Sequence, residues 1–104
     1  MKFYVRETDQ RGRADVHEDR VRDALEKLGH ERGSFEKAEV LILLYDGSGE
    51  EWGRTFAKDF LREKKRRKVI VLGEPMGGGP LFPKDYPAVQ TFAKEEDFLI
   101  SIEH

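Results

Sequence analysis

The sequence predicts a single α/β domain, spanning residues 1–104, with a mainly parallel sheet of about four strands. Short apolar runs alternate along the chain with segments of helical periodicity, and this order is typical of βαβ units. The run EVLILLY at 39–45 is almost entirely apolar, as expected of a central strand covered on both faces. A chain of 104 residues is long enough for one hydrophobic core and rarely divides into two domains.

The first half of the chain is predicted to form a strand, a helix and a second strand. Residues 3–5, FYV, form a short apolar run that indicates a buried strand. From Asp15 the apolar side chains recur at i, i+3, i+4 and i+7, which places on one helix face Val21, Ala24, Leu25 and Leu28. Gly29 is predicted to end this helix, because glycine readily adopts the conformation that closes helices. The central strand at 39–45 follows.

The second half is predicted to form a helix, a strand, an irregular segment, a strand and a helix. A second amphipathic helix is predicted over 54–65, where the apolar positions are Phe56, Ala57, Phe60 and Leu61. The strand VIVLG at 69–73 follows it. Residues 74–87 hold all four prolines and three consecutive glycines, so we expect them to be irregular. A last strand at 89–92 and a closing helix at 94–102 complete the prediction.

The segment ERGSF at 31–35 decides how the sheet is covered. Without a strand there, every crossover can run in the same direction and place all helices on one face of the sheet. The other face then needs a partner, and we expect a homodimer for this reason. A small edge strand at 31–35 is the alternative.

Composition excludes several classes of function. The chain has 19 basic and 21 acidic residues, so its charge favours neither a nucleic acid nor a membrane as partner. The basic run KKRRK at 64–68 is interpreted as complementing a helix C-terminus. The absence of cysteine excludes disulfides and thiolate chemistry, and the three histidines show no metal-binding spacing. No segment approaches the roughly 20 apolar residues of a membrane span. We therefore predict a soluble cytoplasmic protein with no metal and no cofactor.

The loop after the first strand, residues 6–15, is a candidate phosphate site. Its sequence TDQRGRAD joins a strand to a helix, where backbone N–H groups favour an anion. The predicted ligand-binding residues are Thr8, Arg11, Gly12 and Arg13, because a hydroxyl and two guanidinium groups would flank a glycine that permits close approach. The alternative is a solvated turn, since one glycine is a weak phosphate signal.

The loop after the central strand, residues 46–53, is the second candidate. Asp46 could accept a hydrogen bond from a sugar hydroxyl, and Gly47 and Gly53 would allow close backbone approach. The alternative is structural. Asp46 and Gly47 would form a turn, Ser48 or Glu50 would cap the next helix, and Trp52 would cover an edge of the core.

The order of these motifs resembles the nucleoside 2-deoxyribosyltransferase-like superfamily, which includes deoxynucleoside 5′-phosphate N-hydrolases. KFYV resembles its opening strand, which carries a tyrosine, and the resemblance implies that this residue, here Tyr4, contacts the ligand. RGRAD is similar to its Arg-Gly-Gly-Arg phosphate loop, ALEKLGHE to its first helix end, and KAEVLILLYDG to its buried strand followed by Asp-Gly. The end of the chain, KVIVLGEP and then VQTF before an acidic helix, also resembles many members. The resemblance implies a small Rossmann- or flavodoxin-like domain of two or three layers.

The resemblance also implies cleavage of an N-glycosidic bond by a nucleophilic glutamate at the start of the second of these helices. This sequence departs from that pattern, because Ala57 or Lys58 stands where the glutamate is expected. The nearest carboxylates are Glu51 and Asp59, which are our candidate catalytic residues. TIR domains have a similar βα order, and their catalytic glutamate follows a tryptophan at the start of a helix. In this sequence the residue four positions after Trp52 is Phe56, which cannot take that role.

Three hypotheses follow from the sequence. The leading one is a domain that binds a nucleotide or nucleoside phosphate, with weak or no catalysis. The second is an active N-glycosidase or deoxyribosyltransferase that uses Glu51 or Asp59. The third is a non-enzymatic TIR-like or dimerisation module.

Overall fold

The computed structural model describes residues 1–8, 15–45, 49–73, 81–83 and 85–103. Within this part the chain forms five parallel strands and three helices, which confirms the predicted α/β class. In chain order the elements are β1 (Lys2–Glu7), α1 (Asp15–Lys27), β2 (Glu31–Arg32), β3 (Val40–Leu44), α2 (Glu50–Glu63), β4 (Lys68–Leu72), β5 (Val89–Phe92) and α3 (Glu95–Glu103).

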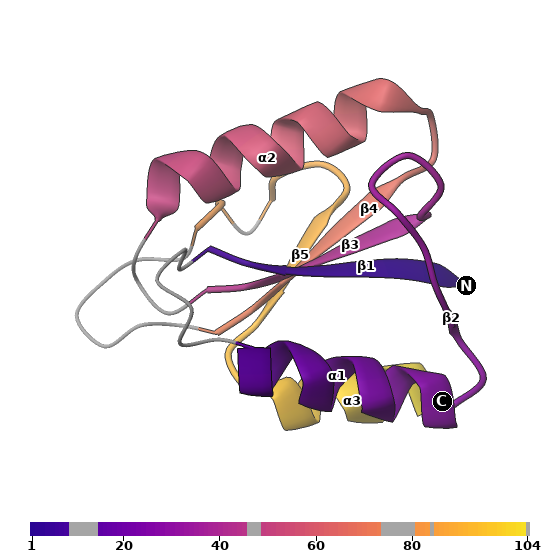
Figure 1. The fold of residues 1–104 in the computed structure, drawn as a ribbon. Helices are drawn as coiled ribbons and strands as arrows, with labels where there is room; N and C mark the ends of the chain where they lie inside the picture. Colours follow the sequence, from indigo (N-terminus) through magenta and orange to yellow (C-terminus); the bar gives the residue numbers. More distant parts are fainter. Residues whose placement is uncertain (9–14, 46–48, 74–80, 84, 104) are drawn as a thin grey trace.

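The strand order is β2-β1-β3-β4-β5, and helices cover both faces of the sheet. The chain steps from β1 outward to β2, and from β3 the other way to β4 and β5. Right-handed crossovers in opposite directions place their helices on opposite faces, and Figure 1 shows α1 and α3 below the sheet and α2 above it. The edge-strand alternative at 31–35 is thus confirmed. The packing argument for a homodimer no longer applies, because the chain covers both faces itself.

The connection from β2 to β3 is short because β2 is short. Arg32 and Val40 both lie level with Phe3 of β1, so the chain leaves β2 at nearly the height at which β3 begins. A crossover that returned along full strands would need about ten or more residues, usually a helix. Here a turn suffices, with the Ala38 amide donating to the Ser34 carbonyl at 2.8 Å.

The core consists of two apolar layers separated by the sheet. One lies under α1 and α3 and includes Phe3, Val5, Val21, Leu25, Ile42 and Phe98. The other lies under α2 and includes Leu41, Leu43, Ala57, Phe60, Leu81 and Phe82. All five residues of β3 are buried, as predicted for a strand covered on both faces.

The structure corrects two helix boundaries. Leu28 was expected on the buried face of α1, but the helix ends at Lys27 and Leu28 is 40% exposed. Gly29 has φ 90°, and the His30 amide donates to the Leu25 carbonyl at 3.1 Å, which closes the helix as predicted. The second helix begins at Glu50 rather than residue 54. Its N-cap is Gly49, with no side-chain cap, and acidic residues in the first turn complement the helix dipole.

The basic run at 64–68 contains a buried side chain. Arg67 is only 4% exposed and donates to the carbonyls of Phe60 at 3.1 Å and Glu36 at 2.6 Å. Its guanidinium carbon lies 4.1 Å from the centroid of the Phe60 ring. Arg67 therefore ties the end of α2 to the turn before β3, a structural role that the sequence did not reveal.

Candidate functional site

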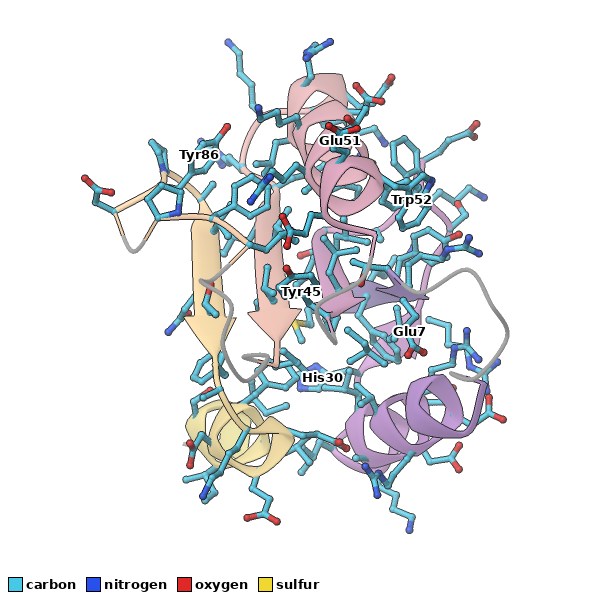
Figure 2. The ribbon with its side chains drawn as sticks, turned by 90° about the vertical axis from the view of Figure 1, so that its left-hand side faces the viewer. Glu7, His30, Tyr45, Glu51, Trp52 and Tyr86 are labelled. Carbon is cyan, nitrogen blue, oxygen red and sulfur yellow. The ribbon has the colours of Figure 1, made fainter. Side chains whose placement is uncertain are left out.

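The candidate site lies at the carboxyl ends of the strands, where the chain leaves β1 toward one face and β3 toward the other. Ligands of open α/β sheets bind at such switch points. A cavity of about 210 Å³ is present here. It is lined by Glu7, Leu44, Tyr45, Leu72, Gly73, Ala93 and Glu95. Figure 2 looks onto this edge and shows Glu7 and Tyr45 below the start of α2.

Carboxylates supply most of the polar chemistry of this cavity. Glu7 is the last residue of β1, and Glu95 is the first residue of α3. The Glu95 carboxylate pairs with Arg20 of α1 at 3.0 Å, which fixes α3 beside α1. Carboxylates accept hydrogen bonds from hydroxyl and amino groups and repel phosphate. The described part of the cavity therefore suits a neutral hydroxyl-bearing or amine-bearing group.

A polar chain connects the cavity to α2 and to the segment after β4. The Tyr45 hydroxyl donates to Glu50 Oε1 at 2.9 Å. Arg54, one turn along the helix, lies 3.6 Å from the other oxygen of Glu50 and donates from Nε to the Leu81 carbonyl at 2.8 Å. These contacts hold the first turn of α2 in one orientation above the strand ends.

Thr8 and Gly53, both predicted to bind a ligand, contact each other. Thr8 is 1% exposed, and its hydroxyl lies 3.3 Å from the Leu44 carbonyl, to which it donates. A Cβ at Gly53 would lie 2.8 Å from Thr8 Cγ2, and one at Gly49 would lie 2.1 Å from the Thr8 carbonyl oxygen. The glycines thus allow α2 to pack closely on the end of β1.

The other predicted residues that the structure describes lie away from the cavity. Tyr4 faces α2, with its ring centroid 6.3 Å from that of Phe56. Glu51 is exposed, and Figure 2 shows it on the side of α2 that faces away from the sheet. Asp59 is exposed in the third turn of α2, 3.7 Å from Arg62. Neither carboxylate lines the cavity.

Five predicted ligand-binding residues lie outside the described part of the chain: Arg11, Gly12, Arg13, Asp46 and Gly47. The segment that holds the first three joins Thr8 to α1, and the segment that holds the other two joins Tyr45 to Gly49. Both segments therefore start next to residues at the carboxyl ends of the strands, which we call the carboxyl edge of the sheet.

Sequence reasoning missed Tyr45 and Glu95 as residues of this edge. A usable signal was present, because carboxyl ends of parallel strands meet at one edge of a sheet. Glu7, Tyr45 and Glu95 each stand at or just after the end of a predicted strand. The structure places Glu7 on the cavity wall.

Comparison with protein-family models, with curated proteins and with solved structures finds no match to this chain. Among the described residues, no group of three or more His, Asp or Glu side chains is placed to hold a metal ion. None of the helices in that same part has both the length and the apolar character needed to cross a membrane.

Proposed function

We propose that this protein binds a nucleotide or nucleoside phosphate at the carboxyl edge of its sheet, with weak or no catalysis. The observation that carries the proposal is the cavity at the switch point, whose wall combines apolar strand ends with the Glu7 carboxylate and Tyr45. Both the position and the mixture of apolar and polar groups are those of small-molecule sites.

The size of the cavity supports binding of one part of the ligand there. Sites for whole drug-sized ligands usually measure roughly 300–1,000 Å³, and this cavity measures about 210 Å³. It therefore suits a sugar or a base, with hydroxyl or amino groups donating to Glu7. In this proposal Arg11, Gly12 and Arg13 hold the phosphate, and Asp46 and Gly47 contact the sugar.

The expectation of weak or no catalysis is supported by the positions of the two candidate carboxylates. Glu51 and Asp59 are exposed on α2 and do not line the cavity. A nucleophile must come within about 3–3.5 Å of the atom that it attacks. A ligand seated against Glu7 would be out of reach of Asp59, because the α-helix rises about 1.5 Å per residue and Asp59 lies nine residues beyond Glu50.

Isothermal titration with deoxynucleoside monophosphates, the matching nucleosides and inorganic phosphate tests the proposal. We expect monophosphates to bind most tightly. Arg13→Ala should weaken monophosphates but not nucleosides. Glu7→Gln should weaken both by about tenfold, the value of one charge-assisted hydrogen bond. Arg62→Ala, on the exposed side of α2, is the control and should bind like wild type. Absence of binding across the whole set would refute the proposal.

Hydrolysis of the N-glycosidic bond is the second candidate, and Glu50 is the observation that favours it. Its carboxylate is held by the hydroxyl of Tyr45, a cavity-lining residue, in the first turn of α2. Chromatography of deoxynucleotides incubated with the protein would detect free base. If the activity exists, we expect Glu50→Gln to abolish it. Loss of activity in Glu51→Gln or Asp59→Asn would instead restore those residues as the catalytic candidates.

A further inference from the structure

Strand β5 ends the sheet with hydrogen-bonding groups directed outward. The Val69 amide donates to the Ala88 carbonyl and the Gly73 amide to the Phe92 carbonyl, both at 2.8 Å. In a parallel ladder, alternate residues turn both backbone groups toward the same neighbour. Residues 88, 90 and 92 therefore face β4, and the N–H and C=O of Thr91 both point away from the sheet.

This edge is uncharged in a chain that is otherwise dense in charge. Residues 87–93, PAVQTFA, include no charged side chain, although 38% of the chain is Asp, Glu, Lys or Arg. Edge strands are usually protected from association by charges or by being very short. The opposite edge follows this rule, because β2 has two residues and both are charged. Strand β5, Val89–Phe92, is twice as long as β2 and has no charged residue and no proline within it, although Pro87 lies two residues before it.

We propose that β5 pairs antiparallel with β5 of a second copy of this chain, about a two-fold axis at Thr91. Thr91 of each copy then donates to and accepts from Thr91 of the other. This register sets Gln90 opposite Phe92 and Val89 opposite Ala93, so that no like charges face each other across the axis. The two sheets become one continuous sheet, and the dimer is closed as a two-fold interface requires.

The charges at the two ends of β5 complement each other in this arrangement. Antiparallel pairing brings the carboxyl end of one β5 beside the amino end of the other. The carboxyl end leads into the acidic first turn of α3, with Glu95, Glu96 and Asp97. The amino end borders a groove of about 820 Å³ whose charged side chains are all basic: the exposed Arg66 and Lys68, and the buried Arg67.

The heights of these two charged regions match. In the proposed register Ala93 of the second copy is level with Val89, and Val89 is level with Val69 of β4. The acidic turn begins two residues after Ala93, so it lies near the height of residues 66–68, about two strand spacings of ~4.8 Å along the sheet and in the helix layer beside it. Asp97 lies about 200° round α3 from Glu95, which pairs with α1, so Asp97 faces the open side of β5. Asp97 of one copy and Lys68 of the other form the proposed ion pair.

Sedimentation velocity over a range of concentrations tests the interface. Wild type should sediment as a dimer. Thr91→Lys sets two ammonium groups opposite each other on the axis, and the dissociation constant should rise by about 100-fold. Thr91→Val keeps the β-branched shape and should remain dimeric. Circular dichroism confirms that each variant is folded. A folded wild type that is monomeric at its highest soluble concentration, or a dimer that ignores Thr91→Lys, would overturn the proposal.

A charge reversal tests the contact between α3 and the groove. Lys68→Glu and Asp97→Lys should each raise the dissociation constant by about tenfold, and the double variant should recover most of the loss because the ion pair is restored with opposite sign. If the loss of affinity in the double variant equals the sum of the losses in the two single variants, Lys68 and Asp97 do not form an ion pair in the interface.

Discussion

Two glycines at helix ends have left-handed backbone: Gly49, which precedes α2, and Gly29, which follows α1. Gly49 has φ 70°, a conformation that L side chains rarely adopt, and a Cβ there would lie 2.1 Å from the Thr8 carbonyl oxygen. Gly29 has a similar φ of 90°, but nothing lies within 4 Å of the position that its Cβ would take. A side chain at Gly29 would therefore cause backbone strain alone, whereas one at Gly49 would add steric overlap with Thr8.

Substitution of these glycines by alanine should have unequal effects. We expect Gly29→Ala to lower the free energy of unfolding by about 1–2 kcal/mol, the cost of left-handed backbone alone. Gly49→Ala should cost about 1–3 kcal/mol more, because the backbone of β1 or α2 must move. Urea denaturation with an unchanged m-value measures both losses. Equal losses would show that the contact with Thr8 relaxes without cost.

Arg67 gives a second prediction at this scale. Its guanidinium group is buried and donates to the backbone carbonyls of Phe60 and Glu36. Neither acceptor is charged, so replacing Arg67 leaves no unpaired carboxylate at these two contacts. We expect Arg67→Met to lower the free energy of unfolding by about 2–3 kcal/mol through lost charged hydrogen bonds and the cation–π contact with Phe60. The exposed Lys65→Met is the control and should stay within about 0.5 kcal/mol of wild type. Thermal or urea denaturation of the pair would decide, and equal stabilities would contradict a structural role for Arg67.

At the scale of elements, the turn between β2 and β3 replaces a helix and is anchored by an aromatic ring. The Phe35 centroid lies 5.1 Å from that of Phe56 and 5.6 Å from that of Phe60, both in edge-on contact. The turn thus covers part of the sheet with one large side chain in place of an amphipathic face.

Phe35→Ala should consequently loosen the turn and the end of α2 together. We expect a loss of about 2–3 kcal/mol, somewhat below the range for a fully buried phenylalanine because Phe35 is only partly buried. Phe35→Leu should lose less than about 1.5 kcal/mol. Hydrogen exchange should be faster at the Lys37 and Ala38 amides in the alanine variant. Unchanged exchange there would mean that the turn is held by its backbone alone.

The sequence predicted long, strongly patterned elements well and predicted ends and short elements poorly. β3 and α1 follow from apolar runs and spacing that local rules describe. The start of α2 did not follow, because its apolar spacing begins at Phe56 and Gly49 supplies no side-chain cap. β2 has two charged residues and no apolar pattern, so only its pairing with β1 reveals it. The burial of Arg67 depends on tertiary partners and has no local signal.

The same limit applies to the candidate site. The edge of the sheet was predictable, since α/β sheets place ligands at the carboxyl ends of their strands. The side chains that line the cavity could not be predicted. Neighbouring residues at the end of β1 point to opposite faces of the sheet, so Thr8 packs under α2 and Glu7 faces the cavity. A shift of one residue in such a strand reverses the roles of neighbouring side chains.

For the whole molecule, the proposed dimer predicts that thermal stability depends on protein concentration. Association of folded chains stabilises them by mass action, so the melting temperature of wild type should rise as concentration increases. Thr91→Lys should melt at a temperature independent of concentration. Differential scanning calorimetry at several concentrations measures this. A flat wild-type profile would agree with a monomer and contradict the interface.

The carboxyl edge repeats one geometry at successive strands. Beyond β1, β3 and β4 the ladder extends by one residue, through the amides of Thr8, Tyr45 and Gly73 at 3.0, 2.9 and 2.8 Å from their acceptors. A Cβ at Gly49 would overlap the Thr8 carbonyl, and one at Gly73 would overlap the Tyr45 carbonyl, each at 2.1 Å. Variants that keep Gly49 and Gly73 should retain this close backbone approach to the ends of β1 and β3, whereas a side chain at either glycine should disturb it.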